Sequence, residues 1–344
     1  MASLPDSFDS AAVSRLRLFA PDPAHAAPLD GGRLTLREVF EARVLPRLIA
    51  IKRGTIAEYR AAITAWERLT ANPPLSQLTD DHAEQLRIGA AAQIDQAKLS
   101  PATYNKWARH LRALLARLAP RDTRNPRGLG LIPFAPLVET LPERLAEPRV
   151  ATRGELSRIY QACTAATWPL IPDPGEVWRL WLVLSYNCGA RRSDLWGLTW
   201  GAIQEREQLL TLRAEKTGKP LRLPLHPTLL AHLQSWRRSA PDAHPATKIF
   251  PFTQSHRHFY GQLYRLQSLA GIGAPLTPQD LRHTCGSAFD DLAPGLGAIV
   301  LGHAPKGVFE KYYRNASRRL RKAVRRLPQP KAFLRILADR KSVV

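Results

Sequence analysis

Apolar residues recur at helical spacing from Thr35 to about Ala119. They stand three and four positions apart, so each run lines one face of a helix. The pattern is broken at Gly54, Asn72-Pro73-Pro74 and Ser100-Pro101. Thr79 and Ser100 are suited to cap the helices that follow these breaks. We predict a small all-helical domain over residues 35–120, preceded by a flexible extension over residues 1–34.

A stretch rich in proline and glycine follows over residues 121–151. Prolines at this density exclude a continuous helix, which predicts a linker between two domains. Helical spacing returns beyond it, and we predict a second domain over residues 152–327. A basic tail is expected over residues 328–344. Its amphipathic part, residues 331–337, is expected to dock on a neighbouring protomer.

The hydrophobic period shortens from helical spacing to alternation in the middle of the second domain. Residues 209–212 and 221–225 alternate on either side of a turn at residues 216–219. Two alternating runs joined by a polar, glycine-containing turn predict a β-hairpin. The expected fold class is therefore mainly α with a small antiparallel hairpin or sheet, an α+β arrangement.

Composition points to a nucleic-acid partner. The chain has 344 residues, and its 50 Lys and Arg against 29 Asp and Glu give a formal charge of +21. Positive charges in such excess repel one another, and binding to a polyanion such as nucleic acid neutralises them. Apolar residues make up 44% of the chain, which is ample for real cores rather than a disordered basic tail.

The sequence also indicates a compartment and the absence of a cofactor. Cys163, Cys188 and Cys285 are odd in number and far apart, without the spacing of a zinc site. No signal peptide and no long apolar stretch is apparent. We expect a cytoplasmic, nucleoid-associated protein without a membrane contact. Neither a phosphate-binding loop nor an acidic metal cluster is visible, so no cofactor and no metal are expected.

Four polar motifs in the second domain stand in an order that no packing rule requires. They are residues 189–194 (GARRSD), 216–219 (KTGK), 279–283 (QDLRH) and 301–303 (LGH). Two adjacent tyrosines, Tyr312 and Tyr313, follow the last motif. Guanidinium groups hold a phosphate through two hydrogen bonds and stay charged, so they can neutralise charge that grows during attack on phosphorus.

These motifs together resemble the active-site boxes of the tyrosine recombinases of the phage integrase kind. The resemblance implies that Arg191, Arg282 and His303 hold the scissile phosphate of a DNA strand. It also implies a mobile lysine in the hairpin turn, Lys216 with Lys219 behind it. That lysine would protonate the departing 5′ oxygen. A plain solvated turn is the alternative interpretation of this lysine motif taken alone.

The resemblance selects a nucleophile by spacing. In this family the tyrosine usually follows the histidine of the Leu-Gly-His box by nine residues, which selects Tyr312. Tyr313 remains a rival, because a shift of one residue in the intervening loop would exchange the two. Neighbouring side chains on a helix diverge by about 100°, so only one phenol can face the phosphate.

One position departs from the family pattern. Gln279 stands where the family most often has histidine. Glutamine can hydrogen-bond a phosphate oxygen but cannot accept a proton near pH 7. Two further residues have supporting roles: Asp194 is expected to hold Arg191 or its turn, and His283 to pack and hydrogen-bond beside Arg282.

The helical domain upstream resembles the core-binding domain of the same family. Two of its segments match those that begin DNA-facing helices there. The expected DNA contacts are Lys52, Arg53, Thr55, Thr103, Asn105 and Lys106, together with Arg192 and Lys219 of the second domain.

The implied activity is cleavage and rejoining of double-stranded DNA through a 3′-phosphotyrosyl intermediate. The family acts as a tetramer on two DNA sites, and a monomer is expected when the protein is free. Three other interpretations stay open. They are a catalytically impaired DNA-binding relative, a type IB topoisomerase-like enzyme, and a basic RNA-binding protein that is not an enzyme.

Overall fold

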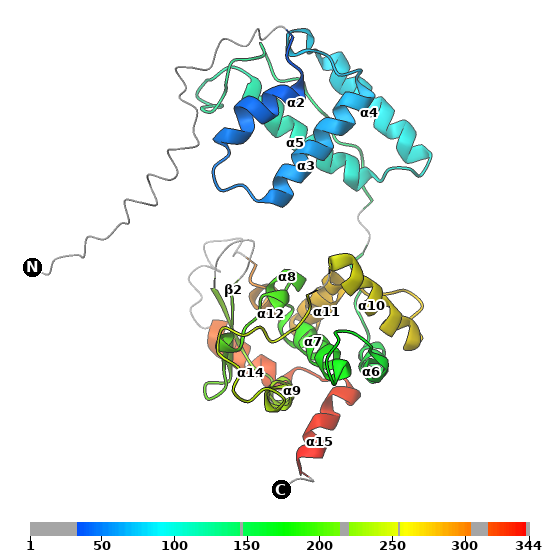
Figure 1. Ribbon diagram of the computed structural model, residues 1–344, viewed down its shortest axis with the longest axis vertical. Coiled ribbons are helices and arrows are strands. Elements are labelled where there is room, and N and C mark those ends of the chain that lie inside the picture. The colour runs from blue at the N-terminus through cyan, green and yellow to red at the C-terminus, as the bar shows by residue number, and fades with distance from the viewer. Residues whose placement is uncertain (1–32, 145–146, 214–219, 254, 304–315, 342–344) are drawn as a thin grey trace, which may run out of the picture. The chain divides into compact units, whose positions relative to one another are not determined.

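The computed structural model describes residues 33–144, 147–213, 220–253, 255–303 and 316–341 (Figure 1). By their contacts, the residues divide into two compact units, Met1–Leu145 and Ala146–Val344. Each unit has its own cluster of buried apolar side chains. A chain of this length is longer than one hydrophobic core usually organises, so two separate cores are expected.

The first unit is helical (Figure 1). Its elements are α2 (Leu36–Val39), η1 (Phe40–Val44), η2 (Leu45–Arg47), α3 (Arg53–Leu69), η3 (Leu75–Gln77), α4 (Asp80–Asp95) and α5 (Pro101–Leu118). Helices α3 and α5 pack together and bury Trp66 and Leu111 completely. Ser100 caps α5 by accepting a hydrogen bond from the Thr103 N–H, as its position before Pro101 predicted.

Much of the stretch expected as a linker is an integral part of the first unit. Ile132 and Val138 are buried in its core. The hydroxyl of Tyr104 donates to the Glu139 carbonyl at 2.8 Å. The Asn105 amide donates to the Leu141 carbonyl at 2.9 Å and accepts from the same residue's N–H at 2.8 Å. Prolines exclude a helix here, but they do not exclude an extended segment that covers a core.

The second unit contains most of the regular structure. Its elements are α6 (Arg153–Ala162), η4 (Cys163–Ala165), α7 (Pro174–Cys188), α8 (Arg192–Trp196), η5 (Trp200–Ala202), β1 (Ile203–Gln204), β2 (Leu209–Arg213), β3 (Pro220–Pro224), α9 (Pro227–Arg238), α10 (His256–Leu269), α11 (Pro278–Asp290), α12 (Leu296–Val300), α14 (Ala316–Arg326), η6 (Lys331–Leu334) and α15 (Arg335–Lys341). Helix α7 is buried on nearly every side, and it packs against α9 and α11 (Figure 1). A helix that is apolar all round belongs at the centre of a domain.

The predicted hairpin is present and carries a third strand. The strand order is β1-β2-β3, all antiparallel. Leu210 pairs with Leu223 and Thr211 pairs with Arg222. Because side chains alternate between the faces of a strand, Leu210, Leu212 and Leu223 enter the core and their neighbours face outward. The fold class inferred from the sequence is confirmed.

Ala332 and Phe333 of the terminal segment pack on their own unit, while docking of residues 331–337 on a neighbouring protomer stays a prediction. Ala332 and Phe333 are 2% and 0% exposed within the second core. The Tyr186 hydroxyl donates to the Pro328 carbonyl at 2.6 Å. Leu334 of the same segment is 41% exposed, so part of the apolar side of this segment is not covered by its own unit.

His226, at the start of α9, gives the second unit a pH-dependent contribution to stability. Burial lowers the pKa of His226 from 6.5 to about 4, because the imidazolium would lose its hydration. Its neutral Nδ1 accepts the Thr228 N–H at 3.0 Å and caps the helix. Since the folded pKa lies below the unfolded one, the contribution is full above about pH 6.5. It is lost as the pH falls toward 4.

We expect this residue alone to lower the free energy of unfolding by about 3 kcal/mol between pH 7 and pH 4. The variant His226→Asn keeps a capping side chain without a titrating one. Chemical denaturation of both proteins at several pH values measures the difference. Parallel stability curves for the two proteins would contradict the assignment.

Candidate active site

The first motif begins where α7 ends. Gly189 terminates the helix in the left-handed region, with φ of 54°. A Cβ at this position would lie 2.4 Å from Leu301 Cδ2 and 3.0 Å from Cys285 Sγ. Only glycine fits both the conformation and the space. The tight turn allows the Gly189 carbonyl to accept a hydrogen bond from Arg282 of α11.

Arg282 joins three of the sequence motifs. Its Nη1 donates to the Gly189 carbonyl at 2.5 Å and its Nη2 donates to the Leu301 carbonyl at 2.6 Å. The same Nη2 lies 3.4 Å from His303 Nε2. The residue is only 5% exposed. Two backbone carbonyls therefore fix the plane of the guanidinium, which leaves its remaining N–H groups for a substrate.

The electrostatics of this arrangement favour an anion. Burial lowers the pKa of Arg282, and the positive charge of Arg191 lowers it further, while Asp194 raises it in part. Arginine nevertheless stays protonated, because its intrinsic pKa is so high. Two guanidinium groups that repel each other across a half-buried site are stabilised when an anion lies between them.

Arg191 is held by a carboxylate of the same motif. It precedes α8 with an extended backbone. Its Nη1 lies 3.8 Å from the Asp194 Oδ2. The Asp194 side chain is 5% exposed, whereas 34% of the Arg191 side chain remains exposed. Asp194 contacts Arg191 as expected, and a third of the arginine side chain stays open to a substrate.

The Leu-Gly-His motif forms the turn after α12. Gly302 has a φ of 64°, and a Cβ there would lie 3.1 Å from Leu221 Cδ2. The His303 N–H donates to the Ala298 carbonyl at 3.0 Å. This turn places the Leu301 carbonyl and the His303 ring on the same guanidinium. The backbone conformation thus requires glycine at position 302, and the turn brings His303 beside the buried guanidinium.

Gln279 and His283 lie one helical turn apart on α11. Gln279 Nε2 is 3.2 Å from His283 Nε2, a distance at which the amide donates to the neutral ring. Gln279 is exposed and His283 is partly buried. The expected local contact of His283 is thus with Gln279, while the neighbouring Arg282 is buried.

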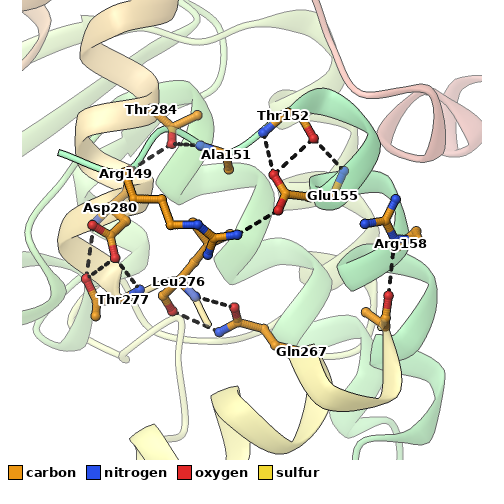
Figure 2. A network of polar contacts seen from close by, with 11 residues as sticks. Arg149, Ala151, Thr152, Glu155, Arg158, Gln267, Leu276, Thr277, Asp280 and Thr284 are labelled. Carbon is orange, nitrogen blue, oxygen red and sulfur yellow. Dashed lines mark hydrogen bonds and ion pairs between the residues drawn. The ribbon is translucent and has the colours of Figure 1, made fainter. Parts of the chain in front are cut away.

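A network of polar contacts fixes α11, the helix that carries Arg282 (Figure 2). Thr277 and Asp280 cap its first turn reciprocally. The Thr284 hydroxyl accepts the Ala151 N–H at 2.8 Å, so the start of the second unit is tied to the helix. Gln267 of α10 hydrogen-bonds both the N–H and the carbonyl of Leu276, just before α11. These contacts hold the helix axis, and hence Arg282, in place.

Arg192 makes contacts that the sequence did not predict. Its guanidinium lies 5.5 Å from the ring centre of Trp196 and 5.9 Å from that of Tyr260. Its Nη2 is 3.2 Å from His256 Nδ1. Cation–π contacts of this kind stabilise an arginine that is partly desolvated. Arg192 therefore links α8 to α10, and its contact with DNA stays a prediction.

The expected DNA contacts of the first unit divide into two groups. Lys52, Arg53 and Thr55 are exposed at the start of α3. Asn105 is 5% exposed, and its amide is used by the backbone of the Leu141 segment. The structure therefore corrects the expectation for Asn105, which holds that segment and does not face a DNA backbone.

Two other residues of α5 in this set are only partly buried. Lys106 forms an ion pair of 2.7 Å with Glu58. The Thr103 hydroxyl lies 2.8 Å from that of Ser100, within the cap of the helix. Both side chains lie near the surface, and their contact with DNA stays a prediction.

Four candidate residues fall outside the part of the chain that the structure describes. These are Lys216 and Lys219 of the hairpin turn, and Tyr312 and Tyr313. Strands β2 and β3 lead into the segment with the lysines. The turn after α12 precedes the segment with the tyrosines.

Sequence reasoning missed the two backbone carbonyls that orient Arg282. Every residue carries a carbonyl, so no side-chain pattern reveals which ones are used. The available signal was the glycine in each motif, Gly189 and Gly302, because glycine marks close approach of the backbone.

Metal-binding clusters and membrane-spanning helices are both absent from the described ranges. Among these residues, no group of three or more His, Cys, Asp or Glu side chains could hold a metal ion. In the same ranges, no helix is both long and apolar enough to span a bilayer.

Comparison with known proteins gives concordant similarities. Residues 149–318 match the model of the phage integrase family. The tyrosine recombinase XerA of Pyrococcus furiosus is 29% identical over 200 residues, which are 54% of this chain and 66% of the relative. XerA of Pyrococcus horikoshii is 26% identical over 155 residues, 42% of this chain and 53% of the relative. The matches thus span less than two thirds of either relative.

Solved structures show the same fold. A lambda integrase (75–356) dimer bound to a COC′ core site has a TM-score of 0.59 at 20% identity, over 79% of this chain and 96% of that one. A lambda integrase tetramer bound to a Holliday junction has a TM-score of 0.60 at 20% identity, over 87% of each chain. The Tn1549 transposon integrase in complex with circular intermediate DNA has a TM-score of 0.58 at 15% identity, over 83% of this chain and 98% of that one.

Proposed function

The chain belongs to the phage integrase family, and we propose that it is a site-specific recombinase that cuts and rejoins double-stranded DNA. The observation that carries this proposal is the position of Arg282. Its buried guanidinium bonds the carbonyls of Gly189 and Leu301 and lies beside His303, with Arg191 close enough to repel it. Three motifs from distant parts of the chain thus build one site for a phosphodiester.

In the proposed reaction, Arg191, Arg282 and His303 bind the non-bridging oxygens of the scissile phosphate. The phenol of Tyr312 gives its proton to water as its oxygen attacks phosphorus, an O–P bond to tyrosine forms, and the bond to the 5′ oxygen breaks. Lys216 gives its proton to that departing oxygen. A 5′ hydroxyl from a partner strand then attacks the phosphotyrosine and releases the enzyme. The energy of the broken phosphodiester bond is retained in the phosphotyrosine bond. The cycle therefore needs no added energy source.

The assembly follows from the need to exchange strands between two DNA sites. We propose a tetramer on paired sites and a monomer when the protein is free. The lambda integrase solved as a tetramer on a Holliday junction, which shares the fold, supports this assembly. Exposed basic residues such as Lys52 and Arg53 would fix the register on the DNA backbone. A cytoplasmic, nucleoid-associated location agrees with such a substrate.

The second candidate is a catalytically impaired DNA-binding relative, and Gln279 is the observation that favours it. Gln279 lies on the same helix as Arg282, one turn earlier, and it contacts His283. A glutamine there cannot accept the proton of the tyrosine hydroxyl. The recombinase proposal therefore requires that phosphate binding and proton donation suffice without a general base at this position.

A nicked suicide substrate tests the recombinase proposal. Such a substrate loses the short fragment that carries the 5′ hydroxyl, so the covalent complex accumulates. We expect a band of DNA-linked protein in denaturing gels that resists boiling and disappears after protease treatment. DNA binding without any covalent band would favour the impaired relative. Relaxation of any plasmid, irrespective of its sequence, would favour the topoisomerase-like interpretation.

A further inference from the structure

A cleft beside the candidate active site has no role in the reaction described above. It has a volume of about 680 Å³ and lies between α8 with the loop that follows it and the outer face of the sheet. Ser193, Asp194 and Thr199 line one wall. Because Asp194 contacts Arg191, this wall adjoins the phosphate site.

The register of the sheet explains what lines the other wall. Thr211 on β2 pairs with Arg222 on β3, and Arg213 follows Thr211 by two residues. Side chains two apart on a strand share a face, so all three point away from the leucines in the core. All three line the cleft.

Two arginines give this cleft a cationic lining in the part of the chain that the structure describes. Within the ranges that the structure describes, neither Arg213 nor Arg222 makes an ion pair or a hydrogen bond. Asp194 is the one acidic residue that lines the cleft in those ranges, and it is held by Arg191. Among the described residues, the buried Thr211 hydroxyl has no hydrogen-bond partner, which costs free energy unless a ligand supplies one.

We propose that this cleft binds a second, non-scissile phosphodiester of the DNA substrate. Arg213 and Arg222 would contact its oxygens, and the Thr211 hydroxyl would donate a hydrogen bond to it. An anion neutralises both guanidinium groups and satisfies the buried hydroxyl at once. The inference rests on the proposed function for the identity of the polyanion, and it adds a site that fixes the strand beside the scissile phosphate.

The experiment combines protein variants with DNA in which single phosphates are neutralised. Arg222→Gln and the wild type are compared in equilibrium binding to uncut duplexes, each with one methylphosphonate at a different linkage near the cleavage point. Arg222→Gln is expected to reduce the slope of log affinity against log salt by about 0.9 for the lost phosphate contact. At one linkage, the methylphosphonate should make the variant and the wild type bind equally.

A matched control comes from the same sheet. Arg206 is exposed in the turn after β1 and does not line the cleft. Arg206→Gln removes the same charge, and it is expected to keep the wild-type response at every linkage. Thermal melting of each variant checks that the fold is retained. Arg213→Gln should bind as tightly as the wild type when the methylphosphonate is at the same linkage as for Arg222→Gln, or at the adjacent one.

Two results would overturn the proposal. In the first, Arg222→Gln responds like the wild type to every methylphosphonate. In the second, the control Arg206→Gln loses the wild-type response at the same linkage, which assigns the effect to net charge and not to the cleft. Because binding is measured without cleavage, the test is independent of the covalent assay. If one methylphosphonate abolishes the difference between Arg222→Gln and the wild type, and no covalent band forms, the phosphate site in the cleft is supported and the recombinase activity is rejected.

Discussion

Tyr312→Phe is expected to abolish the covalent complex with a suicide substrate, while Tyr313→Phe is expected to retain it within about tenfold. The substitution removes only the phenol oxygen, which is the atom that bonds to phosphorus. Tyr312 follows His303 by nine residues, the spacing usual in tyrosine recombinases. If both tyrosines lie on a helix, their side chains diverge by about 100°, and only one phenol would then reach the phosphate.

The two variants control for each other. Each loses one hydroxyl from one of two adjacent tyrosines, so nonspecific effects on folding or on DNA binding should be alike. Affinity for uncut DNA, measured by a mobility shift, is expected to match the wild type in both. If Tyr313→Phe is the inactive variant, the nucleophile is Tyr313 and not Tyr312. If both variants are trapped on DNA, another group attacks the phosphate and the proposed mechanism is wrong.

Local patterns predicted the elements of the fold where a side chain acts on its own neighbours. Ser100 caps α5 because its hydroxyl needs only the N–H three residues later. The strands around residues 216–219 form because alternation buries Leu210 and Leu223 against the core. Such contacts are set within a few residues, so a single sequence suffices to predict them.

The packing of irregular segments could not be predicted in this way. Val138 is fully buried, yet it stands in a stretch broken by prolines, without a period that reveals a face. Phe333 fills the second core from a segment that resembles a short amphipathic tail. Asn105 resembles a DNA-facing residue in sequence, but its amide donates a hydrogen bond to the Leu141 carbonyl. Each outcome depends on a partner far away along the chain, which no local pattern specifies.

The candidate site divides along the same line. Its charged members were identifiable because arginine and histidine at those spacings match a family motif. The way in which Arg282 is oriented was not, since it relies on the carbonyls of Gly189 and Leu301. The positions of those carbonyls depend on how α7 and α12 end against α11, which is a property of the packed domain.

This arrangement predicts a large effect for Arg282→Lys. Cleavage of the suicide substrate is expected to fall by about 10² to 10³-fold, the usual effect of removing a preorganised donor from a transition state. Stability should fall by roughly 1–3 kcal/mol as well, because one ammonium group cannot satisfy both buried carbonyls. Positive charge is kept in this variant, so the loss measures geometry and not charge.

Arg191→Lys separates catalysis from stability. The Arg191 side chain is 34% exposed and forms a long ion pair of 3.8 Å with Asp194, and such exposed pairs contribute little to stability. We expect a similar fall in cleavage and a change of less than about 0.5 kcal/mol in the free energy of unfolding. Single-turnover cleavage rates and urea denaturation measure the two quantities. If Arg282→Lys were as stable as the wild type, the two carbonyl bonds would not hold the guanidinium, and the structural basis of the site would have to be rejected.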